Sequence, residues 1–342
     1  MTAVLIPAST SVATRRPLLG PNWFASVMGT GIVATAAVTL PIHLPGGAEL
    51  AVAFWLLACG LLVALVVVTA RQWLVRPEEA RAHLSDPVLA HFYGAPAMAL
   101  MTVGAGALLV GRPLIGTPAA AAVGLTLWVI GTSIGLWTTL TIPRRLRDTY
   151  RGTAFGGWLM PVVPPMVSAA TGAVVAPHLP ADLRPAMTAT CWTLFVVALL
   201  ASLPLIILIV RRVFAGQLGP AATVPTLFIV VGPLGQSVTA AHALAPDSRL
   251  AMVYGLPVLA LAAVWLVVAT ALTVRTTRTG LPFAMTWWSF TFPIGTVVTG
   301  ASGLAEATGS IVLRDLAVAL FVVLLAAWVT VAVRTLRSLQ TA

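Results

Sequence analysis

The feature that most limits the fold of this 342-residue chain is a series of apolar runs that recur from one end to the other. Each run is about 20 residues long, which as an α-helix matches the hydrocarbon core of a lipid bilayer. Hydrophobic residues make up 59% of the chain and charged residues only 8%, a balance that soluble domains do not have. The predicted fold class is therefore an all-α polytopic membrane protein.

Ten membrane-spanning segments are predicted, and we treat them as one transmembrane domain, residues 21–334, between a short N-terminus (1–20) and a short C-terminus (335–342). We expect no removable signal peptide, because no apolar stretch with a cleavage site precedes the first span. The predicted spans are 21–41, 49–73, 88–111, 117–143, 155–176, 186–212, 223–245, 250–274, 283–305 and 311–334.

The nineteen basic residues are all arginines, and the net charge is +10. In a membrane protein, arginine-rich loops stay in the cytoplasm and set the topology, so we expect no nucleic-acid partner. With the N-terminus inside, four arginines fall on the outer side: Arg112, Arg184, Arg249 and Arg314. The other fifteen are cytoplasmic: Arg15, Arg16, Arg71, Arg76, Arg81, Arg144, Arg145, Arg147, Arg151, Arg211, Arg212, Arg275, Arg278, Arg334 and Arg337. Both termini are thus predicted to be cytoplasmic, with the spans paired as five hairpins.

Every odd-numbered span has glycine or proline near its middle. A proline inside a helix removes a hydrogen bond and kinks the helix, and at membrane depth protein or a water-filled cavity must satisfy the freed backbone groups. We therefore predict a quasi-symmetric inner ring of five kinked helices, with the straighter helices outside it and positive helix N-termini directed into the lumen. The alternative is chance placement, since both residues are common in membrane helices. The predicted kinks lie at Gly29, Gly31, Pro96, Pro161, Pro164, Pro165, Pro233 and Pro293.

The ninth span contains a crowded aromatic stretch from Thr286 to Gly295, which includes Pro293. With helical spacing, Phe292 shares one face with small polar residues on either side of it. A large apolar ring between small polar groups suggests a constricted pathway, although a phenylalanine that only packs between helices would give the same pattern. Trp287 and Trp288 are predicted to belong to the interfacial aromatic belt.

The polar residues expected inside the membrane are uncharged, and no Asp, Glu or Arg falls at the middle of a span. Buried ionisable groups mark proton relays and catalytic sites, so we expect no enzyme activity, catalytic residue, metal or cofactor. Hydroxyl and amide groups can replace part of an anion's hydration shell without holding it tightly; the alternative is that they join helices to one another. The predicted pore-lining residues are Ser26, Thr30, Thr102, Ser168, Gln236, Ser289 and Thr296.

Four short stretches resemble the tellurite-resistance/dicarboxylate transporter family, whose members include fungal malate permeases, fungal sulfite efflux pumps, bacterial tellurite-resistance proteins and plant slow anion channels. The stretches are Pro21–Ile32, Trp158–Pro165, Gly232–Gln236 and Trp287–Pro293. This resemblance implies ten helices in five hairpins around a central pore, in a homotrimer with one pore per subunit. It also implies an aromatic gate in the ninth helix, which corresponds to Phe292, or to Phe290 if the register is shifted.

The leading hypothesis is a cell-membrane channel or channel-like transporter for small inorganic or organic anions: C4-dicarboxylate such as malate, sulfite, chloride or nitrate. An alternative is a proton-coupled dicarboxylate or sulfite carrier or exporter that contributes to tellurite resistance, for which His91, His242 and Glu306 are the titratable candidates. A membrane scaffold or receptor and an intramembrane enzyme are the remaining classes. The sequence leaves open the identity of the anion and the direction of transport.

Overall fold

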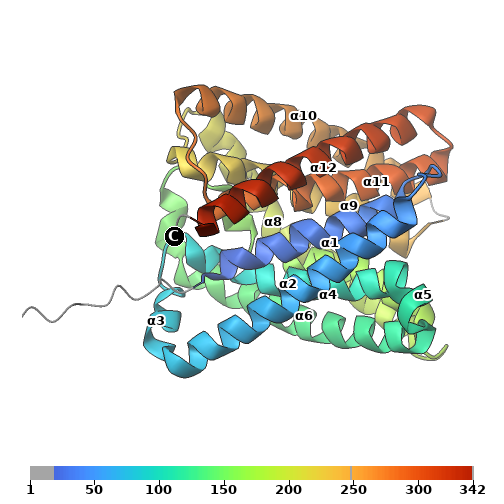
Figure 1. Cartoon of the computed structure of the whole chain (residues 1–342). Coiled ribbons are helices and arrows are strands. Elements are labelled where there is room, and N and C mark those ends of the chain that lie inside the picture. The colour runs from blue at the N-terminus through green and yellow to red at the C-terminus, as the bar shows by residue number, and fades with distance from the viewer. Residues whose placement is uncertain (1–18, 247–248, 341–342) are drawn as a thin grey trace, which may run out of the picture.

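The computed structural model describes residues 19–246 and 249–340, and over these ranges the chain is helical and contains no β-strand. Long and short helices alternate along it (Figure 1). The long helices have 29 to 31 residues each: α2 (Gly47–Val75), α6 (Thr117–Arg145), α8 (Arg184–Phe214), α10 (Arg249–Thr279) and α12 (Ile311–Gln340). The short helices have 12 to 17: α1 (Phe24–Thr39), α4 (Gly94–Gly106), α7 (Pro164–Val175), α9 (Val231–Leu244) and α11 (Phe292–Thr308).

A 3-10 helix precedes each of the short α-helices. The smaller elements α3 (Pro77–Ala82) and α5 (Arg112–Ile115), a π-helical turn (Ala107–Gly111) and two further 3-10 turns (Arg147–Arg151 and Ala176–His178) lie in or beside the connections. The five preceding 3-10 helices are η1 (Pro21–Trp23), η2 (Leu89–Tyr93), η5 (Gly156–Leu159), η7 (Ala221–Val230) and η8 (Met285–Phe290).

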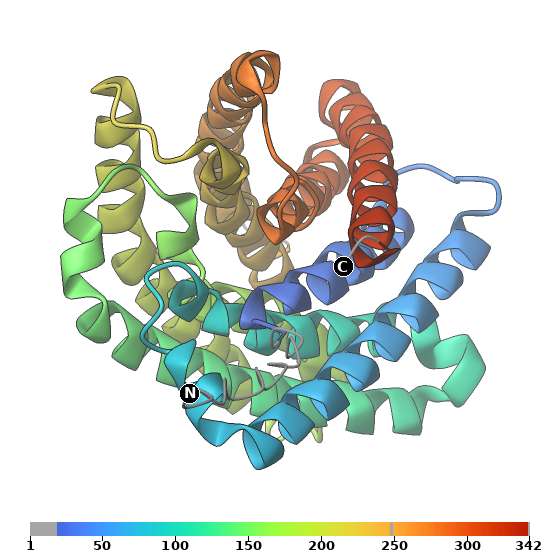
Figure 2. The same ribbon diagram turned by 60° about the vertical axis from the view of Figure 1, so that its left-hand side comes forward.

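The short α-helices form a closed ring, in which α1 contacts α4, α4 contacts α7, α7 contacts α9, α9 contacts α11, and α11 contacts α1. Each long helix packs against the short helix before it in the chain. The long helices therefore lie around the outside of the ring, as Figure 2 shows. Nearly every side chain of α1 and α11 is buried, which is why these helices have no polar face.

The outer helices bury only a narrow stripe. In α2 the six buried residues are spaced three or four apart, so that they lie on one side of the helix: Gly47, Ala51, Trp55, Ala58, Leu62 and Leu65. The opposite side exposes large apolar side chains such as Val63 and Val67, which are 63% and 60% exposed. An apolar outer surface of this kind requires lipid or another protein against it, as expected of a multi-pass membrane protein.

Seven helical segments of the described residues are long and apolar enough to cross a membrane. They coincide with seven of the ten predicted spans. The other three predicted spans, 21–41, 155–176 and 283–305, contain the short helices α1, α7 and α11. Each of these three spans changes from 3-10 to α geometry, so none of them has the uninterrupted length of a straight membrane-spanning helix.

Charge is concentrated at the end of the molecule where the long helices finish, the end with α3 and the C-terminus in Figure 1. Thirteen of the arginines that the structure describes are at this end, against four carboxylates: Glu78, Glu79, Asp86 and Asp148. The opposite end has four arginines and, in the described ranges, four carboxylates: Glu49, Asp182, Glu306 and Asp315. One end is thus strongly positive and the other is close to neutral.

The prediction that Gly29 and Gly31 kink the first span is wrong. Helix α1 runs unbroken through both glycines, and the change from 3-10 to α geometry comes earlier, between Trp23 and Phe24. The glycines instead let two helices approach closely. A Cβ at Gly29 would overlap the Thr291 hydroxyl, and one at Gly31 would lie 2.7 Å from a Thr102 methyl group.

Candidate functional site

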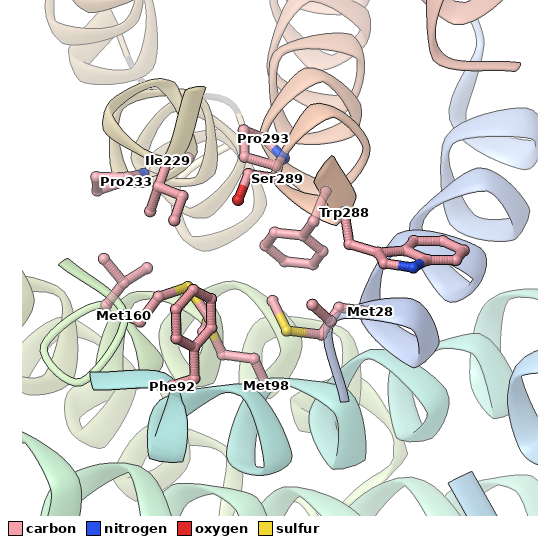
Figure 3. Close-up of a pocket in the computed structure, with 13 residues that line it drawn as sticks. Met28, Phe92, Met98, Met160, Ile229, Pro233, Trp288, Ser289 and Pro293 are labelled. Carbon is pink, nitrogen blue, oxygen red and sulfur yellow. The ribbon is translucent and has the colours of Figure 1, made fainter. Parts of the chain in front are cut away.

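Two cavities lie one after the other inside the ring of short helices. The small cavity, of about 30 Å³, has a largely apolar lining that includes Met28, Met98, Met160 and Trp288 (Figure 3). Among its described lining residues, Ser289 supplies the hydroxyl group. The large cavity, of about 260 Å³, is lined by apolar side chains and by hydroxyl side chains together with Gln236, His242 and Glu306. Among the described residues of both linings, Phe292 is the one that they share.

Phe292 occupies the first position of α11, directly after the junction with η8. Its side chain is 6% exposed. The junction residue, Thr291, keeps a helical conformation, and its hydroxyl donates to the Trp288 carbonyl at 2.7 Å. Pro293 follows in the first turn of α11, where its missing N–H leaves no helical hydrogen bond unmade. The local sequence therefore holds the Phe292 ring between the two cavities.

Phe290 lies elsewhere. Its ring packs edge-on against Phe228, with 4.9 Å between the ring centroids, and against Trp287 at 5.8 Å. It is absent from the linings of the small and the large cavity. Of the two candidates for an aromatic gate, Phe292 is the one that lines both cavities.

The prolines lie in the first turns of the short α-helices rather than at their middles. Pro164 opens α7, Pro293 is the second residue of α11, and Pro96 and Pro233 are the third residues of α4 and α9. Prolines suit this position because the first-turn N–H groups have no partner inside an α-helix. The predicted breaks therefore lie between the 3-10 and the α part of each span.

That positive helix N-termini face the lumen stays a prediction; first-turn residues of α9 and α11 line the small cavity. The residue before each short α-helix has right-handed helical backbone angles, so the 3-10 helix leads into the α-helix. The Gly94 and Thr291 N–H groups donate to carbonyls of the preceding 3-10 helices. Because these donors are already used, the helix dipoles offer an anion less than free helix ends would.

The fifth span contains the widest break, and a neighbouring helix satisfies it. Between η5 and α7 the chain makes turns that include Pro161. The Thr138 and Thr139 hydroxyls of α6 each lie 3.0 Å from the Pro161 carbonyl, and each shares its proton between this carbonyl and that of Gly135, at 2.8 and 2.9 Å. A carbonyl released from helical hydrogen bonding is thus paired by protein, as membrane depth requires.

Of the seven predicted pore-lining polar residues, three line a cavity: Ser289 the small one, and Thr102 and Gln236 the large one. The other four bond to helices. Ser26 donates to the Trp23 carbonyl, and Thr296 donates to the Pro293 and Gly232 carbonyls. Thr30 accepts a hydrogen bond from Trp328 at 3.0 Å, and Ser168 accepts one from Thr132 at 3.0 Å. For Thr30, Ser168 and Thr296, the alternative that polar groups join helices describes the structure, whereas Ser26 bonds within its own span.

The environment of Trp288 differs from the interfacial aromatic belt that the sequence predicts. It is 4% exposed, its ring N–H donates to the Thr335 hydroxyl at 3.1 Å, and its side chain lines the small cavity. Trp288 is therefore buried beside Phe292 and does not belong to an interfacial belt. The sequence could not show this, because two adjacent tryptophans near a span end look alike, and only packing against α12 distinguishes them.

His242 and Glu306 were expected near the ends of spans, and the structure brings them together in the lining of the large cavity. The His242 Nε2 atom lies 3.8 Å from a Glu306 carboxylate oxygen. The imidazole packs over Gly303, which leaves room for it one turn before Glu306. Helical spacing places Gly303 and Glu306 on one face of α11, but which residue of α9 meets that face depends on tertiary packing.

His91, the third titratable candidate, is fully buried, and its ring packs edge-on against Phe155 at 5.7 Å. It is absent from the linings of the small and the large cavity. Among the described residues, no group of three or more His, Cys, Asp or Glu side chains is arranged to hold a metal ion.

Known proteins resemble this chain over most of its length. A sulfite efflux pump of Arthroderma otae is 26% identical over 334 residues, which cover 91% of this chain and 88% of the pump. A sulfite efflux pump of Trichophyton rubrum is 25% identical, with the same coverage. An uncharacterised transporter of Methanocaldococcus jannaschii is 25% identical over 292 residues, covering 82% of each chain.

The family model described as voltage-dependent anion channel, SLAC1, matches residues 19–336. The match includes all of the short helices, both cavities and Phe292. The chain therefore belongs to the SLAC1 family, the tellurite-resistance/dicarboxylate transporter family, and is an anion transporter.

Proposed function

We propose that small anions cross the membrane through the ring of short helices, by way of the small cavity, Phe292 and the large cavity. The observation that carries the proposal is that Phe292 lines both cavities. Its ring closes the path sterically, and the apolar lining of the small cavity disfavours water and ions beside it. Movement of this one side chain would join the two spaces.

The orientation proposed for this pathway has ten membrane crossings, with both termini in the cytoplasm. The thirteen described arginines at the ends of the long helices support it, because arginine-rich loops remain on the cytoplasmic side. Their positive potential would also raise the local concentration of anions at that mouth. The membrane in this proposal is the cell membrane.

Sulfite is the first substrate to test, since two similar proteins are named sulfite efflux pumps. Malate, chloride and nitrate follow, and a part in tellurite resistance belongs to the same proposal. A homotrimer is proposed as well; the apolar outer faces of the long helices are compatible with lipid or with further copies of this chain. Mass measurement of the protein in a lipid nanodisc would determine the number of copies.

Phe292→Ala tests the gate. We expect anion current through purified protein in planar bilayers to rise about tenfold or more, since lowering a barrier by about 1.4 kcal/mol increases a rate tenfold. Phe290→Ala is the matched control, because it removes the same ring two residues away, outside the lining of either cavity. Equal currents from wild type and Phe292→Ala, with both proteins folded, would disprove the gate.

A proton-coupled carrier is the second candidate, and the His242–Glu306 pair in the large cavity favours it. A carrier of this kind moves protons with its substrate. Uptake of sulfite into liposomes that is driven by a pH gradient, saturates, and acidifies or alkalinises the lumen would support the carrier. Large ohmic anion currents without proton movement would support the channel.

A further inference from the structure

The hydroxyl groups of the large cavity have already used their protons. Thr102 donates to the Met98 carbonyl at 2.8 Å, and Thr171 to the Val167 carbonyl at 2.7 Å. Thr35 and Thr39 likewise donate to carbonyls of α1. Each hydroxyl has one proton, so these four groups turn lone pairs toward the cavity.

The remaining two hydroxyls of the lining form a hydrogen bond with each other. Thr239 and Thr299 lie 2.7 Å apart, and each is also within hydrogen-bond distance of a backbone carbonyl. Whichever of them donates to the other, both protons are used. A ring of hydroxyl acceptors alone repels an anion, so donors have to come from other side chains that line the cavity.

Gln236 and His242 are those donors. Gln236 is 5% exposed, and its side-chain oxygen is buried without a hydrogen-bond partner. Because that oxygen is buried and the residue lines the cavity, its amide N–H₂ group is the part that can face the lumen. The His242 Nδ1 atom is also buried without a partner, and Nε2 lies toward Glu306.

Glu306 is the one carboxylate in this lining. Its distance of 3.8 Å from His242 exceeds a hydrogen bond, and its side chain is 58% exposed against 20% for His242. The carboxylate is therefore loosely held and can move away from the imidazole. A carboxylate and a small transported anion carry the same charge and would accept a hydrogen bond from the same N–H group.

We propose that Gln236 and His242 form an anion-binding site in the large cavity, and that the Glu306 carboxylate competes with the transported anion for the His242 ring. The inference rests on the proposed function, because it assumes that anions pass through this cavity. The ligand class is a small monovalent anion or oxyanion. Glu306 would weaken its binding and so allow release, as conduction requires.

Few other ionisable groups are close enough to disturb this site. Helices α1, α4 and α7, which supply the rest of the cavity wall, contain no ionisable residue. On α10, Tyr254 donates to the Ser237 hydroxyl at 2.9 Å, and His178 beyond α7 is bonded to the Val174 carbonyl. On α12, Arg314 shares a neighbouring cavity with Glu306 and is paired with Asp315 at 3.0 Å. The charge of the site is therefore set by His242 and Glu306.

The lining side chains act on an anion in opposite ways. The Gln236 amide and the His242 ring can donate hydrogen bonds to it, whereas the negative charge of the Glu306 carboxylate repels it.

Two measurements on the full-length protein test the proposal. The first is binding of sulfite to purified protein by calorimetry, and the second is the half-saturating chloride concentration of the Phe292→Ala current. We expect Glu306→Gln to lower both the dissociation constant of sulfite and the half-saturating chloride concentration about tenfold, equivalent to about 1.4 kcal/mol. The matched control is Glu49→Gln, which removes an exposed carboxylate at the same end of the molecule, outside the cavity.

His242→Gln and Gln236→Leu should each weaken anion binding. Glu306→Gln alone keeps the proposal testable if the other variants fold poorly, since its side chain is half-exposed and the two residues have the same shape. The proposal is overturned if Glu306→Gln matches Glu49→Gln in both measurements. If Phe292→Ala conducts but Glu306→Gln has no effect, the inference fails alone; if sulfite binds as expected and no variant conducts, the proposed pathway fails instead.

Discussion

At the scale of single residues, the packing around the proposed pathway depends on glycines, which have no side chain, as much as on the large residues. Gly29 of α1 faces Thr291 and Trp288, the two residues that precede and flank Phe292. The glycine allows α1 to lie directly against the junction between η8 and α11. The position of Phe292 is thus determined partly by a residue of the first helix.

Gly29→Ala should destabilise the protein by about 1–3 kcal/mol, because its Cβ would overlap the Thr291 hydroxyl and displace it. The measurement is thermal unfolding in detergent or nanodiscs. Gly60→Ala is the matched control: Gly60 also lies within a helix, but its Cβ would meet nothing within 4 Å. The control should be neutral or stabilising, since alanine favours a helix more than glycine does. Equal melting temperatures for the two variants would contradict this account of Gly29.

At the scale of helices, the alternation of short buried and long half-exposed elements determines where the helical hydrogen bonding can be interrupted. Breaks occur in the short helices, which are surrounded by protein, and the freed groups find partners there. The Pro161 carbonyl, with two threonine hydroxyls from α6, is the clearest case. The outer helices carry prolines too, at positions 143, 204 and 257, yet remain α-helical through them.

Thr138→Val combined with Thr139→Val should destabilise the fold by about 1–3 kcal/mol, because the buried Pro161 carbonyl loses both donors. Either substitution alone should cost less, since one hydroxyl remains. Thr141→Val on the same helix is the control: this exposed hydroxyl donates only within α6, to the Trp137 carbonyl. Chemical unfolding monitored by tryptophan fluorescence would compare them. A double variant as stable as Thr141→Val would show that another group satisfies the carbonyl.

The sequence predicted the apolar segments and the neighbourhood of the breaks, because both depend on local composition. It could not distinguish 3-10 from α geometry, since the two helices place side chains at nearly the same spacing over a few residues. It also misplaced Ser26, Thr30, Ser168 and Thr296, because the face that each helix turns inward depends on its neighbours. His242 and Glu306 lie on different helices, so the sequence of either segment alone does not indicate that they are close.

At the scale of the whole molecule, the difference in charge between the two ends of the helix ring distinguishes one side of the protein from the other. The proposed topology places the positive end in the cytoplasm, and the ends of α8 provide a test of it, because this helix has an exposed loop at each end. Residue 182 precedes the helix and residue 217 follows it.

Asp182→Cys should react with a membrane-impermeant maleimide added to intact cells, whereas Gln217→Cys should react only after the membrane is opened. Both positions are exposed, while the native Cys191 is buried and Cys59 is half-buried, so background labelling should be small. The variant without added cysteine measures that background. Labelling of residue 217 in intact cells, without labelling of residue 182, would invert the proposed topology.

The difference in charge between the two ends also affects how the purified protein enters an artificial membrane. Moving an arginine-rich surface through hydrocarbon is far more costly than moving a nearly neutral one. Protein added to preformed liposomes should therefore insert with its neutral end first and leave the arginines facing the outside. Reconstituted vesicles would then hold molecules of one polarity, and an inward and an outward gradient applied to them would report the two directions of transport separately.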